Sequence, residues 1–271
     1  MHRPIRPRGG RPNPRDGARS DASVERRREG PNLRCHYGRA ACAALLHRRP
    51  ESVDRAFLDA DRARDLATFV RLLLKTRCTH REVPSDELER LAQSRHHEGV
   101  VLFAPPIDWP SWTELLEAPG PGQLVLTEVG LNPHNLGAIT RTAGHFGVRG
   151  IGAVDGPVSI AGAAGRIAEG AAEHVPYARL EDGAWACRLA RANGWTVVAT
   201  DGSSDLSVHD WAPPEGRVLW LLGQEGRGLS DALRAEAQVT VAIPGTGVVE
   251  SLNVSVAAGV LFSEGARRIR G

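Results

Sequence analysis

The most informative part of the sequence is Ile243-Pro-Gly-Thr-Gly-Val-Val-Glu-Ser-Leu-Asn-Val-Ser-Val-Ala-Ala-Gly259. An apolar strand over residues 239–243 ends at the proline, a glycine-containing loop follows, and a helix over residues 254–269 is predicted after it. The first turns of that helix are rich in small side chains, which indicates that a backbone or a partner chain packs close to them. Taken alone, Ser251 and Asn253 could equally be helix caps.

Strands and helices alternate in the same way along the rest of residues 123–271. The pattern predicts strands over 124–128, 149–154, 196–200 and 218–222, and helices over 136–146, 161–169, 184–192 and 229–235. Such alternation implies a parallel sheet with helices on both faces. Ligands of open α/β sheets bind beyond the carboxyl ends of the strands, so the loops at those ends are the candidate site.

One of these loops leads into the helix that carries Arg141. An Asn-Pro pair forces an extended turn, and Asn135 is expected to cap the helix. The face with Arg141 also carries two glycines and a histidine (Gly137, Gly144 and His145). Helical glycines indicate a close approach, either by a phosphate that Arg141 grips or by a neighbouring element that packs tightly.

A second loop, within residues 219–230, carries the pattern Gly-x-x-Gly-x-Gly after an apolar strand. Glycines let backbone amides approach a ligand, although a tight strand-to-helix turn would also need them. Glu225 would repel a pyrophosphate, so the pattern is not a dinucleotide fingerprint, and a neutral or cationic ligand fits better.

The chain before residue 123 predicts three further segments. Residues 1–31 hold nine Arg against four acidic residues, whereas the rest of the chain holds 25 basic against 28 acidic residues. This segment is predicted to be a disordered cationic arm, or else a solubility tail without a partner. Residues 32–104 predict a small α/β domain, in which Ser85 caps a helix and residues 99–104 form a buried strand. Residues 105–122 are rich in proline and predict a linker with one short helix near 112–116.

Several chemistries are excluded by the residues present. Lys75 is the only lysine and lacks the Gly-Lys-Ser/Thr context of a P-loop. His96-His97-Glu98 and Cys78-Thr-His80 lack zinc-ligand spacing, so no metal is expected, and no G-x-S-x-G sequence indicates a serine hydrolase. Four scattered cysteines, no apolar run of bilayer length and no secretory signal favour a reducing cytoplasm and no membrane.

Taken together, the three loops resemble the motifs of the SpoU (TrmH) family of RNA ribose 2′-O-methyltransferases. Asn-x5-Arg at 135–141, Leu-Gly-x-Glu-Gly-x-Gly at 222–228 and Ile-Pro…Glu-Ser-Leu-Asn-Val-Ser at 243–255 match in order and spacing. His96-His-Glu-Gly-Val-Val resembles the end of the small RNA-recognition domain of many members. The resemblance implies a parallel α/β sheet with a C-terminal trefoil knot, S-adenosylmethionine (SAM) as cofactor, a homodimer and an RNA substrate.

The resemblance also implies roles for individual residues. The cofactor is expected at Leu222, Gly223, Gly228, Ile243, Leu252 and Asn253. The catalytic group is expected to comprise Arg141, Asn135, Glu225, Ser251 and Asn253. A free Arg is a poor base. Arg141 is therefore expected to clamp phosphate and ribose, while the proton leaves through the substrate phosphate or a water.

Two alternatives stay open from the sequence. The chain could be an RNA-binding or ribosome-associated module that keeps the fold without turnover. Among enzymes of the resembling family, both tRNA and rRNA serve as substrates, and the separate small domain favours rRNA. The roles of His96 and His97 are not assigned.

Overall fold

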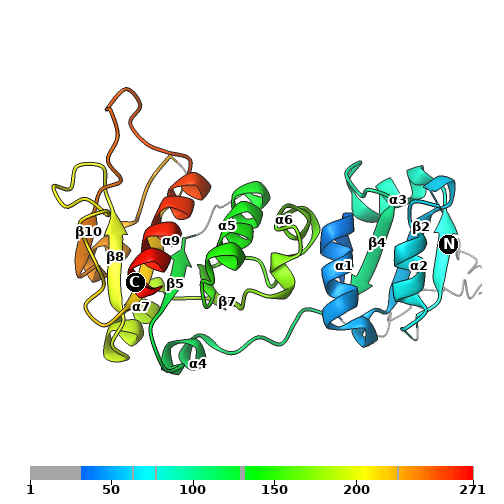
Figure 1. The fold of residues 1–271 in the computed structure, drawn as a ribbon, viewed down its shortest axis with the longest axis horizontal. Coiled ribbons are helices and arrows are strands. Elements are labelled where there is room, and N and C mark those ends of the chain that lie inside the picture. The colour runs from blue at the N-terminus through cyan, green and yellow to red at the C-terminus, as the bar shows by residue number, and fades with distance from the viewer. Residues whose placement is uncertain (1–31, 63, 77, 129–131, 225, 271) are drawn as a thin grey trace, which may run out of the picture. The chain divides into compact units, whose positions relative to one another are not determined.

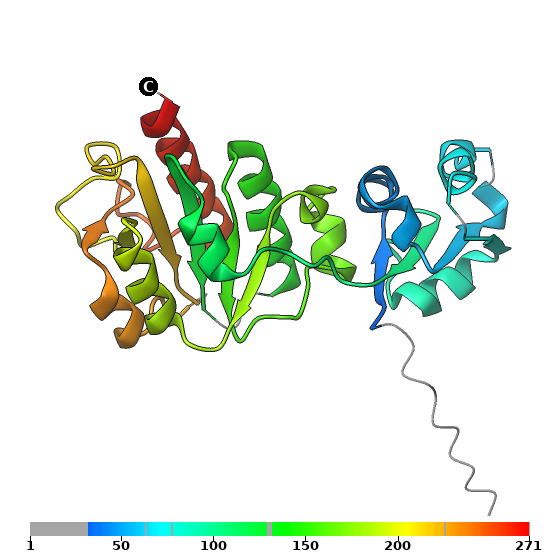
Figure 2. The same ribbon diagram turned by 90° about the horizontal axis from the view of Figure 1, so that it is seen from below.

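The computed structural model describes residues 32–62, 64–76, 78–128, 132–224 and 226–270. These residues form two sheets, one of four strands and one of six (Figures 1 and 2). The predicted arm at 1–31 and Glu225 lie outside the described residues. No helix of the described part has the length and hydropathy that a membrane span requires.

The first sheet has the strand order β1-β4-β2-β3 and mixed directions. Its strands are β1 (Arg34–Tyr37), β2 (Arg55–Asp59), β3 (His80–Val83) and β4 (Val100–Ala104), and its helices are α1 (Arg39–Arg48), α2 (Ala67–Leu73) and α3 (Ser85–Ala92). β4 pairs antiparallel with β1 and β2, whereas β2 and β3 are parallel. Buried side chains of α1 and α2 share one core with β2 and β4, and Leu88 of α3 lies in a second core with Tyr37 and Val101.

The start of α3 differs from the prediction. Ser85 is the first helical residue, and Pro84 occupies the N-cap position without a side-chain hydrogen bond. A proline before the helix holds an extended backbone, so the helix begins one residue earlier than a Ser85 cap would allow. The Ser85 hydroxyl instead lies 3.4 Å from Nε2 of His97.

The second sheet is parallel throughout, which confirms the predicted parallel sheet. Its strand order is β10-β8-β9-β5-β6-β7. The strands are β5 (Gly122–Thr127), β6 (Ile151–Val154), β7 (Tyr177–Leu180), β8 (Thr196–Thr200), β9 (Arg217–Leu222) and β10 (Val239–Val241). Apolar side chains of α5 (Pro133–Phe146) and α9 (Val254–Arg270) fill one core, and those of α7 (Gly183–Ala192) and α8 (Asp231–Glu236) fill another.

Part of the predicted linker packs into this second sheet. α4 (Trp112–Glu117) begins with a capping box in which Ser111 and Glu114 exchange hydrogen bonds. The indole of Trp112 donates to the carbonyl of Ala186 at 3.4 Å, and the indole of Trp195 donates to the carbonyl of Leu116 at 2.9 Å. Buried indole N–H groups need such partners, and these two fix α4 against α7 and β8.

The N-terminus of α5 corrects another expectation. Asn132, not Asn135, is the N-cap, and its side-chain oxygen accepts the N–H of Asn135 at 2.9 Å. Pro133 occupies the first helical position, where its missing N–H and fixed φ suit a helix start. The helix therefore begins three residues earlier than predicted, and Asn135 lies buried within its first turn.

The glycines of α5 are explained by packing within the chain. A Cβ on Gly137 would come 2.6 Å from the carbonyl oxygen of Ala164 in α6 (Gly162–Ile167), and one on Gly144 would come 3.0 Å from the Cβ of Ala171. Of the two readings of these glycines, the neighbouring element is the one that the structure supports.

Candidate functional site

Hydrogen bonds join the loops that follow three strands of the parallel sheet. The Nδ2 of Asn253, just before α9, donates to the Oδ1 of Asn135 in α5 at 3.2 Å. The backbone N–H of Ser230, before α8, donates to the Oε2 of Glu128, just after β5, at 2.8 Å. Segments that are far apart in sequence thus meet at the carboxyl edge of the sheet, which is where a parallel sheet places its ligands.

The loop after β9 closes on itself. Gln224 and Gly228 exchange two backbone hydrogen bonds of 2.9 Å each. A Cβ on Gly223 would lie only 2.2 Å from the carbonyl carbon of Gly228. Gly223 is therefore needed by the turn itself, which supports the turn reading of the glycine pattern at that position. Leu222 is buried at the end of β9, and Gly228 has φ +70°, in the region that favours glycine.

The loop between β10 and α9 is exposed. Ile243 is half-buried, whereas Ser251, Leu252 and Asn253 are exposed. The Oδ1 of Asn253 accepts hydrogen bonds from the N–H and the hydroxyl of Ser255, at 2.9 and 2.6 Å. Asn253 thus caps the start of α9 with its side-chain oxygen, while its amide nitrogen donates to Asn135. The residue can therefore be a helix cap and a member of the candidate site at the same time.

One glycine of that loop leaves space that no part of the described chain fills. A Cβ on Gly245 would meet no atom within 4 Å, and its φ does not lie in the left-handed region. Neither packing nor backbone conformation therefore requires glycine at this position. Gly226, Gly228 and Gly247 likewise face open space, but their positive φ already accounts for them. Gly245 is therefore a candidate position for a close approach of a ligand to the backbone.

Arg141 lies exposed on α5, and its guanidinium has no hydrogen bond or ion pair among the described residues. It lines a cavity of about 470 Å³ together with His145, Glu169 and His174. The sequence placed His145 on the Arg141 face through the four-residue spacing, but no signal marked Glu169 or His174, which the fold brings from the segment after α6.

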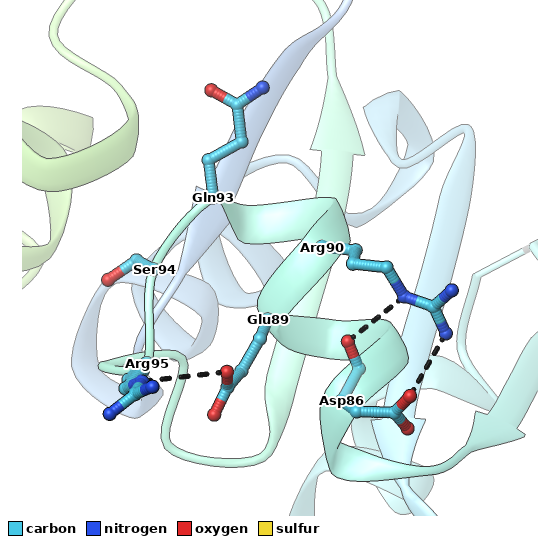
Figure 3. A pocket seen from close by; sticks show the side chains of 6 residues that line it. All are labelled: Asp86, Glu89, Arg90, Gln93, Ser94 and Arg95. Atoms are coloured by element: carbon cyan, nitrogen blue, oxygen red, sulfur yellow. Dashed lines mark hydrogen bonds and ion pairs between the residues drawn. The ribbon is translucent and has the colours of Figure 1, made fainter.

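A second cavity, of about 690 Å³, lies along α3 and the segment that follows it (Figure 3). Its charged groups pair with one another, because Arg90 contacts Asp86 at 3.1 Å and Arg95 contacts Glu89 at 3.7 Å. All four charged side chains of this lining are therefore engaged with one another. The cavity beside Arg141 is thus the better candidate for substrate.

The environments of His96 and His97 do not resemble a metal site. His97 is buried, and its Nδ1 accepts the N–H of Gly99 at 3.1 Å, while burial lowers the pKa of its imidazole. His96 is exposed. Within the described ranges, no group of three His, Cys, Asp or Glu side chains is arranged to hold a metal ion. His97 has a structural role in the turn before β4.

Comparison with known protein families shows to which family the chain belongs. Residues 123–263 match the model of the SpoU rRNA Methylase family. The chain belongs to the SpoU methylase family. A second model, RNA 2′-O ribose methyltransferase substrate binding, matches residues 36–110. The SpoU match spans all three loops described above and includes Arg141, Asn135 and Asn253.

SpoU relatives resemble this chain over most of its length. An uncharacterized tRNA/rRNA methyltransferase YfiF of Escherichia coli O157:H7 is 35% identical over 245 residues, covering 90% of this chain and 70% of that protein. The 23S rRNA (guanosine-2′-O-)-methyltransferase RlmB of Bordetella pertussis is 32% identical, covering 85% of this chain and 96% of that one. A Mycolicibacterium vanbaalenii relative is 37% identical, and the chain spans 62% of its length.

Solved SpoU structures share the fold. The AdoMet-bound rRNA methyltransferase from Sinorhizobium meliloti superposes with a TM-score of 0.71 at 23% identity, covering 87% of each chain. The SpoU methyltransferase AviRb from Streptomyces viridochromogenes, in complex with AdoMet, superposes with a TM-score of 0.68 at 25% identity, covering 86% of this chain and 89% of that one.

Proposed function

We infer that this chain transfers a methyl group from SAM to a ribose 2′-hydroxyl of RNA. The observation that carries the inference is the hydrogen bond between Asn253 and Asn135, which joins the first and third SpoU motifs next to the helix that presents Arg141. The unpaired guanidinium and the space beside Gly245 give this site room for both substrates.

SAM is held at the loops after β9 and β10 in this proposal. Backbone around Gly223, Ile243 and Leu252 contacts its adenosine and methionine parts, with Leu222, Gly228 and Asn253 completing the pocket. The cofactor supplies a sulfonium methyl group to an attacking oxygen. SAM carries no phosphate group, which agrees with an acidic residue, Glu225, in this motif.

Arg141 positions the RNA rather than removing the proton. Its guanidinium stays protonated and offers a fork of donors that suits a phosphate and the neighbouring ribose. Holding the 2′-oxygen in line with the methyl group at near-attack distance accounts for a large part of the catalysis. The proton leaves through the substrate phosphate or a water. Asn135, Glu225, Ser251 and Asn253 hold Arg141 and the ribose in place.

The RNA substrate is tRNA or rRNA, and rRNA is favoured. The substrate-binding match over residues 36–110 and the similarity to a relative named as a 23S rRNA methyltransferase support this choice. An RNA-modifying role, together with free cysteines at all four positions, supports a cytoplasmic enzyme.

The assembly is proposed to be a homodimer of knotted methyltransferase domains. Four large apolar side chains are exposed between residues 248 and 256: Val248, Val249, Leu252 and Val256. Exposed apolar side chains gathered in one segment mark a contact surface. A partner chain against this segment would complete each site. Membership in the SpoU family supports the further proposal of a trefoil knot within residues 123–271.

The test is transfer of labelled methyl groups from SAM to total bacterial RNA. Arg141→Ala is expected to lose at least about 100-fold of the activity while it keeps SAM binding, because a positioned charge contributes several kcal/mol only in the reacting complex. Arg71→Ala, which removes an exposed Arg from α2, serves as the matched control and should stay active. Transfer by Arg141→Ala at the wild-type rate would refute the role of Arg141.

A further inference from the structure

The cavity beside Arg141 is lined by α5, by the segment after α6, and by one residue of α1. α5 contributes Arg141, Gly144 and His145, and the segment from Ala168 to His174 forms the opposite wall. Ala44 of α1 completes the lining. The volume of about 470 Å³ lies in the range of sites that hold a small ligand or a nucleotide, about 300–1,000 Å³.

Three side chains of this cavity have nitrogen atoms that bind no other residue in the part of the chain that the structure describes. Arg141, His145 and His174 are exposed, and none of their side chains makes a hydrogen bond or ion pair with another described residue. His145 follows Arg141 by four residues, so both lie on one face of α5. The ring of His145 packs edge-on against Phe146, at 4.8 Å between centroids, which restricts its orientation.

The wall that carries His174 is held firmly. Glu173, 3% exposed, accepts two hydrogen bonds from the guanidinium of Arg49, at 2.7 and 2.9 Å. Gly170 has φ +90°, and a Cβ there would come 2.9 Å from the Cβ of Ala44. Glu169 also has a positive φ, +50°, which is costly for a residue with a side chain. The turn therefore holds Glu169 and His174 at the cavity at a cost in backbone strain.

The donors and the acid together match an RNA backbone. A phosphodiester presents acceptors to Arg141 and the two imidazoles, and a ribose 2′-hydroxyl presents a donor to the carboxylate of Glu169. The remaining lining is Gly144, Ala168, Gly170 and Ala171. Packing within the chain requires the two glycines, and none of the four residues has a long side chain that would fill the cavity.

We propose that this cavity binds the sugar-phosphate unit next to the methylated nucleotide, with His145 and His174 as phosphate donors beyond Arg141 and Glu169 as the acceptor of a flanking 2′-hydroxyl. The proposal rests on the proposed function, since it deepens the description of the same RNA site. His145 and His174 are positioning residues: they raise the affinity for RNA and fix the strand without contacting the methyl group.

The experiment compares two double variants: His145→Ala with His174→Ala (the alanine pair), and His145→Arg with His174→Arg (the arginine pair). The probes are in vitro transcribed rRNA for binding and methyl transfer, and SAM for calorimetry. The alanine pair is expected to raise KM for RNA about 10-fold or more with kcat within about two-fold of wild type, whereas the arginine pair keeps the wild-type KM. His96→Ala, an exposed histidine that does not line the cavity, is the matched control.

Outcomes separate this proposal from the proposed function. Unchanged RNA affinity in the alanine pair, with Arg141→Ala still inactive, overturns the subsite and leaves the methyltransferase in place. Reduced SAM affinity in the alanine pair would mean damage to the fold and would also contradict the proposal. An equal rise of KM for RNA in the alanine and arginine pairs would contradict a phosphate contact, because arginine preserves the donors. No transfer by the wild type to any RNA would overturn the function itself.

Discussion

Arg49 and Glu173 form a buried ion pair, and one change tests its energetic role. Arg49 also donates to the carbonyl of Pro105 at 2.6 Å. Arg49→Ala would leave the Glu173 carboxylate buried without its partner, so we expect a loss of about 3–5 kcal/mol in the free energy of unfolding. Arg90→Ala removes the exposed pair with Asp86 and should cost less than about 1 kcal/mol. Denaturant unfolding of both variants measures the difference; equal losses would contradict the burial argument.

His36 predicts a pH dependence of stability. It is 7% exposed, its Nε2 has no hydrogen bond in the described part of the chain, and burial lowers the pKa of its imidazole to about 4. The unfolded chain takes up the proton near pH 6.5, before the folded chain does, so folding loses stability as pH falls from about 6.5 to 4. The loss is on the order of 3 kcal/mol. His36→Leu should remove this part of the pH dependence in denaturant titrations, and a slope equal to wild type would refute the assignment.

At the scale of loops and strands, two glycines should respond oppositely to the same added methyl group. Gly223→Ala places a Cβ against the backbone of Gly228, so the loop must move and both stability and SAM affinity should fall. Gly245→Ala meets no protein atom, so stability should stay within about 0.5 kcal/mol while SAM affinity falls. Gly202→Ala, with its nearest heavy atom at 4.0 Å, should change neither. Thermal melting measures the stability and calorimetric titration measures the SAM affinity. A wild-type SAM affinity in Gly245→Ala would contradict the proposed SAM site beside Gly245.

The sequence predicted the elements with strong periodicity and missed several of the short ones. The parallel strands β5, β8 and β9 and the helix α9 were predicted close to their observed bounds because their apolar patterns are long. The four-residue strands β1, β3 and β7 were missed. Two of the four residues in β1 and β7 and three of the four in β3 are not buried, so their apolar pattern is weak. The strands β6 and β10, which are no longer than these, were predicted because they are more apolar. The N-cap of α5 was assigned to Asn135 instead of Asn132, because both asparagines satisfy the same local rule and Pro133 decides between them.

The candidate site shows the same division. Motif order predicted that Asn135, Arg141 and Asn253 act together, and the structure brings Asn135 and Asn253 into a hydrogen bond. The sequence could not show that Gly137 and Gly144 are required by α6 and Ala171, since that depends on how distant segments pack. It also could not show His174 at the Arg141 cavity, because no spacing rule links residues of separate elements.

At the scale of the whole molecule, the exposed apolar segment before and within α9 predicts self-association. Val256 is 53% exposed on the first turn of α9. Val256→Glu would place a charge in the proposed interface, where unpaired charges are costly. We expect sedimentation to show a dimer for wild type and a monomer for this variant, with SAM binding weakened. A wild-type monomer at micromolar concentration would contradict the proposed assembly.

The arm at residues 1–31 predicts a salt-dependent contribution to RNA binding. Deleting it removes a net charge of +5, from nine Arg and four acidic residues. Phosphate contacts by such an arm weaken steeply with salt, so the deletion should reduce rRNA affinity at low salt and have little effect near 0.5 M. Calorimetric SAM affinity should not change. Equal rRNA affinity with and without the arm at low salt would identify it as a tail without a partner.

The central claim is that three loops at the carboxyl edge of the parallel sheet hold a methyl donor beside a guanidinium that positions ribose. Its most direct test is nucleoside analysis of RNA after incubation with this protein and SAM labelled in the methyl group. The account predicts label in a 2′-O-methylated nucleoside, and its absence when Arg141 is replaced by Ala. Label on a base, or no label in any RNA offered, would contradict it.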